Sequence, residues 1–540
     1  MATEHATRPL PAGAGTRAAI GRAWLAPGAL LVLLVALVLR GHDVDDGRMS
    51  PDDGEFLRSA RVHALEPGAS PAAWIAEDRD WAGELAEDFG RVEGRSTYQH
   101  GYLHQLCIRY AVRVGERVGF GRVAALRLDQ AIFGALTALL VVLWLRRVAP
   151  REPLVALAGG ALMAVQLGHV LVSRTGWGQA ACTFFIVWMI AIAWRMFTEA
   201  GERDTRALVR GALGIAVTSL LAYGFHEMAT VYAFLLAVLV VLLFRTGPDG
   251  VSRWPWRSRR VLFGLLGCLP VGLLTIGLLA FSEYARETWF SASITSFTWW
   301  EVRRLAFLYL FDTVGILRQI SWPILALAAV GLGGAFTRDM RWLIWLVAWV
   351  VLPTALLFLR FNFPQIARIY LPVDVMIVVL AAEGLGVLWG LARHRAAVAL
   401  ADAVAVLAIV WCGAVTWSTV FAGPSAPLYV GQVHHPLREG LSPRRPFYDI
   451  EVTLARLEPD APIAVAFVWG PAYRALDLGH DVRFVELDAL PPDEEPPRLV
   501  LATRRAMESP AAGRMTAQGG PYALAAVDRY DSIGLYLRTR

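Results

Sequence analysis

The chain has 540 residues and not one lysine, so all 51 of its strongly basic side chains are arginines. Charged residues of both signs make up only 18% of the sequence, and hydrophobic residues make up 56%. This composition excludes an ordinary soluble domain and predicts repeated membrane spans. The formal net charge of +5 is small for this length. Because most arginines lie between apolar runs, the charge indicates membrane topology and implies no nucleic-acid partner.

Cysteine is also scarce, and its spacing excludes the common metal and redox motifs. The four cysteines stand singly, without any CxxC pair, at Cys107, Cys182, Cys268 and Cys412. We expect them to be small core residues. His100 and His104 are one helical turn apart, a spacing that can bind a metal. Because no third ligand accompanies them, we interpret them as hydrogen-bonded histidines and predict no metal or other cofactor.

Apolar runs long enough to cross about 30 Å of hydrocarbon recur along the chain. We predict about eleven spans, at 22–40, 126–145, 153–172, 178–197, 208–224, 227–245, 260–281, 320–337, 341–360, 369–391 and 396–420. No small-residue cleavage site follows the first run, so we expect a retained anchor and not a signal peptide. The predicted fold is an all-α polytopic membrane protein.

Arginines gather in alternate short loops, and this orients the spans. Arginine-rich loops lie before the first span and near 146–151, 203–210, 245–260, 338–341 and 393–395. By the positive-inside rule these loops face the cytoplasm, with membrane phospholipid as their expected partner. The N-terminus is then cytoplasmic. The loops "SRTGWGQ" and "GFHE", and the chain after Phe421, face outward from the plasma (inner) membrane, which we take to be bacterial.

One apolar segment, 101–120, carries Arg109, Arg113 and Arg117 at four-residue intervals, which form one charged face of a helix. Burying that face in hydrocarbon is costly, so we predict a helix that lies along the outer membrane surface. Residues 41–125 then form one outer loop, which is too long for a simple connection and is predicted to be functional.

The composition changes after the last span, so we divide the chain into a membrane domain, 1–422, and an extracytoplasmic domain, 423–540. Short runs of strand character occur at 461–470, 481–488, 497–506 and 533–539, with helical segments at 446–458 and 471–479. This alternation predicts a small α/β domain. It contains no phosphate-binding glycine loop, nucleophile motif or metal-ligand cluster, so we assign it no chemistry.

Five segments, taken in order, resemble one family of membrane enzymes. They are "SPDDGEFLRSAR", "YQHGYLHQLCIRYAVRV", "ALRLDQAIFGALTALLVVLWLRR", "LVSRTGWGQAACTFFIVWMIAIAWR" and "FPQIARIYLPVDVMIVVLAAEGLG". The set is similar to glycosyltransferase family 39, of the protein O-mannosyltransferase and aminoarabinose transferase type, which has the GT-C fold. The likeness covers about Trp24 to Ala392. It implies transfer of a monosaccharide from a polyprenyl-phosphate carrier to an acceptor, which the sequence does not identify, on the outer membrane face.

The resemblance also implies the site. The family's acidic pair falls on Asp52 and Asp53, with Asp52 as the catalytic base. The substrate-binding positions that we predict from the family motifs and from their place at outer span ends are Glu55, His100, Arg127, Arg174, His226, Glu227, Arg303, Arg368 and Tyr370. One departure is that Gln179 stands where the family has an aspartate.

Structural interpretations compete with several of these roles. The segment "SPDDGEF" also fits a helix start, with Ser50 as the cap and acidic residues favoured by the helix dipole. His226 and Glu227 can bind substrate or pair with Arg303 or Arg304. The acidic residues in or near spans are expected to find buried partners inside the bundle: Asp374, Glu383 and Asp402.

Two other functions fit a chain with this many spans. A secondary transporter would show internal repeats and broken helices with polar groups near the bilayer midplane. A non-catalytic scaffold would lack a functional constellation. The placement of Asp52, Arg174 and Arg368 at the outer face favours the enzyme over both.

Overall fold

The computed structural model describes the chain in separate stretches. These are residues 14–42, 44, 102–119, 122–149, 152–199, 201, 203–244, 258–281, 320–338, 340–360, 370–392, 394–422, 450, 453–454, 456–457, 463–466, 482–484, 497–503, 507, 522–527 and 533–539.

Helices form at every predicted span. They are α1 (Ala14–Gly41), α5 (Arg122–Val148), α6 (Pro153–Ala164), α7 (Leu167–Val172), α8 (Gln179–Glu199), α9 (Thr205–Phe225), α10 (Ala229–Phe244), α11 (Arg259–Phe281), α15 (Trp322–Arg338), α16 (Met340–Arg360), α17 (Leu371–Leu391) and α18 (Arg395–Trp417), the last continued by the π-helix η5 (Ser418–Ala422). Within the described stretches, seven helices are long and apolar enough to cross a membrane, and four more apolar helices are shorter. The chain is a multi-pass membrane protein.

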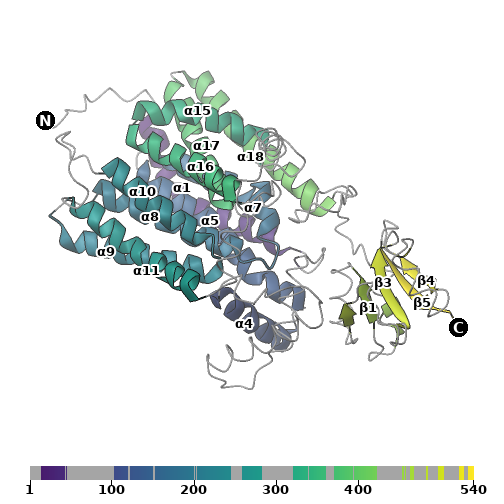
Figure 1. Cartoon of the computed structure of the whole chain (residues 1–540). Coiled ribbons are helices and arrows are strands. Elements are labelled where there is room, and N and C mark those ends of the chain that lie inside the picture. The colour runs from purple at the N-terminus through teal and green to yellow at the C-terminus, as the bar shows by residue number, and fades with distance from the viewer. Residues whose placement is uncertain are drawn as a thin grey trace, which may run out of the picture.

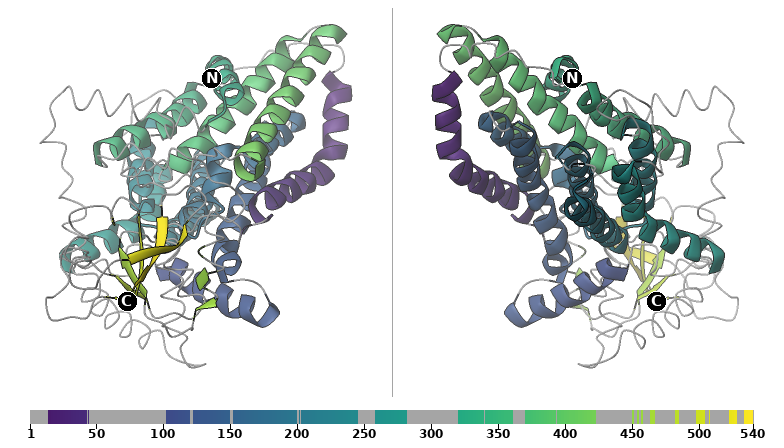
Figure 2. Two further views of the ribbon diagram at one scale, coloured as in Figure 1. Left: turned by 90° about the vertical axis from the view of Figure 1, so that its right-hand side faces the viewer. Right: turned by 90° about the vertical axis from the view of Figure 1, so that its left-hand side faces the viewer.

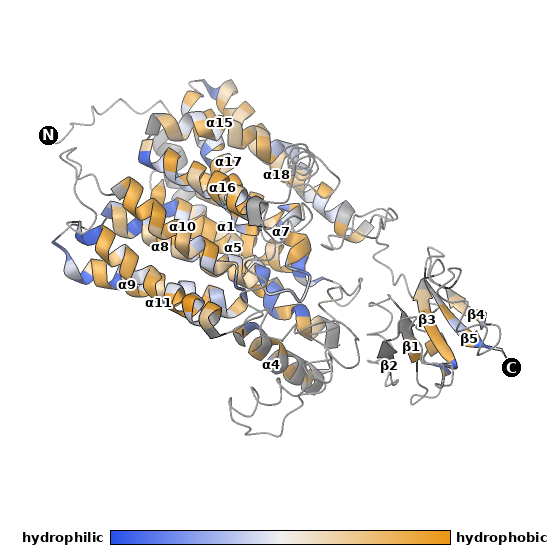
Figure 3. Cartoon of the chain, viewed as in Figure 1, coloured by the Kyte–Doolittle hydropathy of each residue, from blue (hydrophilic) through white to orange (hydrophobic). Residues whose placement is uncertain are grey.

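The spanning helices lie side by side in one bundle (Figure 1). Apolar residues run along the helices, and polar residues gather where α8 ends and α9 begins (Figure 3). The predicted outer end is the end where α1 finishes and where the loops 173–178 and 226–228 lie. The predicted inner end carries Val148, Glu199 and Thr205, at which α5 and α8 finish and α9 starts.

The amphipathic segment forms α4 (Tyr102–Val118) as predicted. It lies at an angle to the spans, across their predicted outer end (Figure 2). Its buried Ile108 packs in a small apolar cluster with Leu126 of α5, Trp177 of the 173–178 loop and Leu371 of α17. The helix is therefore a platform at the bundle end and not a further span.

One predicted span, 153–172, is two helices, and the prediction of a single helix there is wrong. The helix α6 ends at Ala164 and α7 starts at Leu167, after Gln166, whose side-chain oxygen accepts from the His169 amide and caps α7. The carbonyls released at the break find side-chain donors, because Thr416 Oγ1 donates to the Val165 oxygen at 2.7 Å. The break therefore leaves these polar groups satisfied in an apolar bundle.

Arg40 is the other donor at this break, and it is fully buried. Its Nη1 donates to the Ala164 oxygen at 2.9 Å, and its Nη2 donates to the Met163 oxygen at 3.3 Å and to His169 Nδ1 at 3.3 Å. Gly134 of α5 leaves room for Ser173 and for Arg40, since a Cβ there would overlap the Ser173 side chain and lie 2.8 Å from Arg40 Nε. The last carbonyls of a helix carry partial negative charge. A guanidinium from α1 therefore stabilises the end of α6.

Close backbone packing joins α15 to α17. A Cβ on Gly331 would overlap the Leu380 carbonyl, and one on Gly384 would overlap the Leu327 carbonyl. In hydrocarbon, where apolar burial gives little drive for helix association, such close contact through small residues holds helices together. The pair fixes α17, whose first turn reaches the predicted outer end.

The C-terminal region contains a sheet of five strands in the order β2-β1-β3-β5-β4. These are β1 (Ile463–Ala466), β2 (Val482–Phe484), β3 (Leu499–Thr503), β4 (Tyr522–Val527) and β5 (Ile533–Arg538). Strands β2, β1 and β3 are parallel, and β5 and β4 pair antiparallel beside them. The four predicted strands are confirmed. The sequence analysis missed β4, whose alanines favour a strand weakly. The predicted helix 471–479 lies outside the described residues. The described chain stops at Ala422 and resumes at Ile450, so the domain boundary at 422/423 stays a prediction.

Removing the Arg40 guanidinium should destabilise the protein. In Arg40→Met the buried Ala164 and Met163 carbonyls lose their donors, and we expect a loss of roughly 2–4 kcal/mol, the cost of about two unsatisfied buried groups. Arg40→Lys should recover only part of this, because an ammonium has a single nitrogen and cannot reproduce the bonds that Nη1 and Nη2 make to two carbonyls. Thermal unfolding of the purified protein in mild detergent measures the effect. Arg210→Met, at an exposed arginine of α9, is the control and should change stability by less than about 0.5 kcal/mol; equal effects of both variants would contradict the capping role.

The predicted orientation can be tested by labelling introduced cysteines with a membrane-impermeant maleimide. Native cysteines should give little background: Cys182, Cys268 and Cys412 are buried, and burial, helped by the Asp129 charge, raises the pKa of Cys107 to about 11 and keeps it protonated. Ala525→Cys, at an exposed position of β4, should react in intact cells. Arg203→Cys, at the predicted inner end, should react only after permeabilisation. The reverse pattern would invert the whole topology.

Candidate active site

The predicted site residues divide into two groups. Asp52, Asp53, Glu55, His100, Arg303 and Arg368 lie outside the described residues. The other predicted residues, Arg127, Arg174, His226, Glu227 and Tyr370, are described, and all five lie at the predicted outer end. Their placement at one end of the bundle agrees with the expectation.

Arg174 binds the end of α1. It follows α7 by two residues, and its Nη1 donates to the His42 oxygen at 2.6 Å, with the Leu39 and Arg40 oxygens at 3.3 and 3.4 Å. Its guanidinium carbon also lies 4.9 Å from the centre of the Phe421 ring. The Leu39 and Arg40 oxygens belong to the last turn of α1, where helix carbonyls lack intrahelical partners, and His42 follows that turn directly. Arg174 is therefore a side-chain cap for α1.

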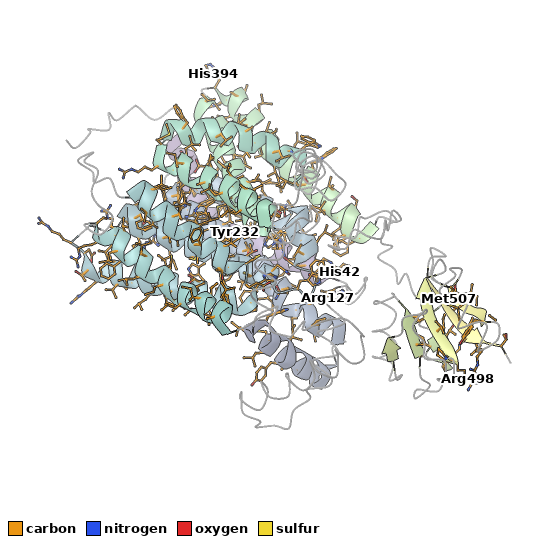
Figure 4. The ribbon with its side chains drawn as sticks, viewed as in Figure 1. His42, Arg127, Tyr232, His394, Arg498 and Met507 are labelled. Atoms are coloured by element: carbon orange, nitrogen blue, oxygen red, sulfur yellow. The ribbon has the colours of Figure 1, made fainter. Side chains whose placement is uncertain are left out.

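Arg127 binds the main chain two residues beyond His42. It is 3% exposed, and its Nη1 donates to the Val44 oxygen at 2.8 Å. Figure 4 shows Arg127 and His42 on the same side of the bundle end. Two guanidinium groups from different elements thus hold the backbone as it leaves α1. The acidic segment that begins at Asp52 follows eight residues after Val44 in the sequence.

Aromatic contacts add to this anchor. The His42 ring lies nearly parallel to Trp417, with centroids 6.2 Å apart, and 5.3 Å from the Phe421 ring. Trp417 ends α18 and Phe421 lies in η5, so these contacts tie the first span to the last. Phe421 is also the ring beneath Arg174. Hence α1, α7 and α18 meet at one point of the predicted outer end.

The loop 173–178 is held from the opposite side by α4. His104 is completely buried, and its Nε2 donates to the Gly176 oxygen at 2.7 Å, while its Nδ1 lies 3.6 Å from Asp129 Oδ2. The interpretation of His104 as a hydrogen-bonded histidine is confirmed. Gly178 has φ +73° and its Cβ would lie 2.8 Å from the Phe225 oxygen, so both conformation and space require glycine there.

Gln179 starts α8 directly after this loop, and its side chain is buried. Neither its amide oxygen nor its amide nitrogen has a hydrogen-bond partner among the described residues, and the same holds for the hydroxyl of Thr183, one turn further on. Buried polar atoms of this kind usually bond to water or a ligand. An amide both donates and accepts, so it can bond to a hydroxyl group, but it cannot act as a base.

His226 and Glu227 form the tight turn between α9 and α10. His226 Nδ1 accepts from the Met228 amide at 3.1 Å, so the ring proton sits on Nε2 if the ring is neutral. Glu227 Oε2 lies 3.4 Å from the same Nδ1. An Nδ1 that accepts the amide proton cannot also donate to a carboxylate, so this approach is not an ion pair. Their predicted alternative partners, Arg303 and Arg304, lie outside the described residues.

Tyr370 precedes α17 and is 1% exposed, so it belongs to the core beneath the outer surface. Tyr232 of α10, which is labelled in Figure 4, is fully buried as well. Asp374, one turn into α17, accepts from Gln166 Nε2 at 3.4 Å. Glu383 and Asp402 accept from the indole nitrogens of Trp342 and Trp389, at 3.3 and 2.9 Å. The expected buried pairing is found for Asp374 and Glu383, whereas Asp402 bonds to Trp389 at an exposed position of α18, so the expectation is wrong there.

Among the described residues, no group of three or more histidine, cysteine, aspartate or glutamate side chains could hold a metal ion. Two features of the outer end were missed by the sequence analysis, namely the burial of Arg40 and the anchoring of residues 39–44 by Arg174 and Arg127. The sequence shows only that these residues are arginines. Their partners are mainly main-chain carbonyls, which every residue type has, so no sequence pattern identifies them.

Comparison with known proteins gives the fold. No protein-family model matches the chain, and no curated protein matches its sequence. ArnT from Cupriavidus metallidurans, solved with undecaprenyl phosphate, matches with a TM-score of 0.57 and 13% identity, over 94% of this chain and 98% of that one. The oligosaccharyltransferase of Archaeoglobus fulgidus, solved with zinc and sulfate, matches with a TM-score of 0.52 and 12% identity, over 95% and 73%. These are membrane glycosyltransferases of one architecture, and this chain has their fold, the GT-C fold.

Proposed function

We propose that this protein is an integral membrane glycosyltransferase that moves a monosaccharide from a polyprenyl-phosphate carrier to an acceptor at the outer face of the membrane. The fold supports the reaction class. ArnT was solved with undecaprenyl phosphate, and the Archaeoglobus fulgidus oligosaccharyltransferase AglB was solved with dolichol phosphate and a peptide. Both ligands are lipid phosphates, the class of carrier proposed here.

The observation that carries the proposal is the double anchor on the chain leaving α1. Arg174 and Arg127 bind the main-chain oxygens of His42 and Val44, just before the acidic segment that contains Asp52. A general base must be held within hydrogen-bond reach of the proton that it removes. Two arginines hold the start of the loop that leads to Asp52, and this supports its proposed position at the membrane surface, where a lipid-borne substrate is found.

The proposed reaction is a nucleophilic substitution at the anomeric carbon of the sugar. The acceptor hydroxyl oxygen forms a bond to the anomeric carbon as its proton passes to the Asp52 carboxylate. The bond between that carbon and the phosphate oxygen breaks, and its electron pair leaves with the lipid phosphate. Arginines near the phosphate stabilise this charge, because a guanidinium matches two phosphate oxygens at once. Asp53 orients its neighbour.

The broken span, α6–α7, is the feature that a secondary transporter would share. At this break the carbonyls without helical partners already accept from Arg40 and Thr416, so they are not available to a substrate or ion. The fold of the chain is also that of glycosyltransferases. We therefore keep the enzyme as the proposal.

The test is transfer by membranes that contain the protein. Membranes are incubated with a panel of radiolabelled polyprenyl-phosphate sugars, and the products are separated into lipid, protein and glycan fractions and identified by mass spectrometry. Membranes without the protein provide the background. Transfer of one sugar to one fraction supports the proposal; no transfer from any carrier by a well-folded protein would refute it.

Asp52→Asn should leave a folded, membrane-inserted protein but lower sugar transfer by roughly 10²-fold or more, the usual scale for a positioned acid–base group. Asp53→Asn should cost less. Glu55→Gln, at a predicted substrate-binding carboxylate two residues beyond the pair, tests whether the base has been assigned to the right residue. If Asp52→Asn transfers normally and one of the other two is inactive, the base has been assigned to the wrong carboxylate; if all three are active, the segment is a helix start without a catalytic role.

Variants of Arg174 and Arg368 test whether these arginines bind the donor phosphate or hold the chain that leaves α1. Loss of a charged hydrogen bond to the donor phosphate should weaken donor binding by about 1.5–3 kcal/mol, seen as a raised KM for the donor. Loss of the α1 cap should instead lower kcat at an unchanged KM. We expect the KM effect in Arg368→Ala and both effects in Arg174→Ala, because Arg174 also binds α1. Unchanged donor dependence in both variants would remove them from the phosphate site.

A further inference from the structure

A cavity of about 480 Å³ opens at the predicted inner end, between α5, α8 and α16. Its apolar wall includes Leu143, Trp144, Trp188 and Trp342, and its mouth includes Arg147, Arg195 and Glu199. These residues occupy the last turns of α5 and α8 and the first turn of α16. From Trp188 to Glu199 the wall runs about 16 Å along the helix axis. The cavity is therefore on the opposite side from the candidate active site.

One side of the cavity wall is fixed by packed tryptophan rings, and the other side has exposed apolar side chains. Trp342 packs against Trp194 with ring centroids 4.7 Å apart and edge-on against Trp144 at 5.9 Å, and its Nε1 donates to Glu383 Oε1 at 3.3 Å. Leu143 and Trp188 are 58% and 41% exposed. Because both lie within apolar spans, this exposed surface faces hydrocarbon. The wall therefore accommodates an acyl chain.

The mouth has a net positive charge. Glu199 accepts from Arg147 Nε at 3.2 Å through one oxygen and from Arg195 Nε at 2.9 Å through the other. Neither arginine bonds through its Nη groups to another residue in the part of the chain that the structure describes. Glu199 thus holds the two guanidinium groups together and leaves their outer edges for a second anion. A phosphate oxygen pair fits such edges.

Trp144 adds a polar group below this mouth. Its side chain is 5% exposed, and its Nε1 has no hydrogen-bond partner among the described residues. An indole nitrogen can only donate, and a buried donor usually has an acceptor. Trp144 lies three residues before Arg147 on α5, about 4.5 Å deeper along the axis. The ester carbonyls of a glycerophospholipid lie at such a depth below its phosphate.

We infer that this cavity binds an anionic glycerophospholipid of the inner leaflet. Its phosphate lies on Arg147 and Arg195, an ester carbonyl accepts from Trp144 Nε1, and one acyl chain lies on the tryptophan wall. A polyprenyl phosphate has the phosphate but no ester carbonyl, so the diacyl lipid is the occupant. This site is separate from the proposed catalytic function and does not rest on it.

Lipid binding is measured by native mass spectrometry of the full-length protein released from mild detergent, titrated with four pure lipids. These are phosphatidylglycerol, phosphatidylcholine, the ether-linked analogue of phosphatidylglycerol, and undecaprenyl phosphate. We expect phosphatidylglycerol to bind at least about 10-fold more tightly than phosphatidylcholine, because both carry the phosphate but the choline cation of phosphatidylcholine is repelled by Arg147 and Arg195. The ether analogue should bind about 3-fold more weakly than the ester, because it lacks the carbonyl acceptor.

Two variants separate the contacts. Arg147→Gln/Arg195→Gln should reduce phosphatidylglycerol binding to the level of phosphatidylcholine. Trp144→Phe keeps the aromatic wall and should abolish the difference between ester and ether lipids while leaving the preference for an anionic headgroup. Arg206→Gln/Arg210→Gln removes the same charge from exposed positions of α9 outside the cavity and should change nothing. Trp144→Phe tests the site even if the double arginine variant does not fold.

Equal binding of phosphatidylglycerol and phosphatidylcholine by the unaltered protein would overturn the inference. So would equal loss in the α9 control, which would show a diffuse charge effect and no site. A preference for undecaprenyl phosphate over phosphatidylglycerol, unaffected by Trp144→Phe, would assign the cavity to the polyprenyl carrier and overturn the diacyl lipid. None of these results depends on whether the protein transfers sugar.

Discussion

The capping of helix ends by guanidinium groups is the interaction on which the predicted outer end depends. In hydrocarbon, each carbonyl freed at a helix end needs a donor. Arg40 supplies one to the end of α6, and Arg174 supplies one to the end of α1. Arg127 extends the same pattern to Val44. If these donors were lost, main-chain oxygens would have no hydrogen-bond partner at the break between α6 and α7 and where the chain leaves α1.

A chain without lysine is suited to this arrangement. Arg40 bonds to three main-chain oxygens and one imidazole nitrogen through Nη1 and Nη2 alone. An ammonium has only three donors on a single atom and cannot spread them over two helices. The guanidinium is also more weakly hydrated than an ammonium, which lowers the cost of its burial. Arginine thus acts both as a topology signal in the loops and as a structural donor inside the bundle.

The sequence predicted the features that repeat along the chain and missed those that depend on contacts between distant residues. Apolar length predicted the spans, and arginine spacing predicted α4, because each signal lies within one segment. The break at Val165–Gln166 depends on Arg40 and Thr416, which are 124 residues before Ala164 and 251 after Val165. Arg40 is the last residue of the span predicted at 22–40, and no signal within that segment indicates its burial. Similarly, β4 is weak by propensity and is fixed by pairing with β5.

Gln179 stands where the family that the sequence resembles has an aspartate, and this limits the chemistry available at that position. A carboxylate in this buried place would need a cation or several donors to remain charged, whereas the described surroundings give the amide of Gln179 no partner. The neutral amide avoids that cost and keeps one donor and one acceptor function for a hydroxyl or a water. It also means that this position supplies no base. Proton removal in the proposed reaction then falls to the acidic segment that follows α1. The backbone held by Arg174 and Arg127 ends eight residues before Asp52, so in the proposed reaction the anchoring of α1 serves the chemistry as well as the structure.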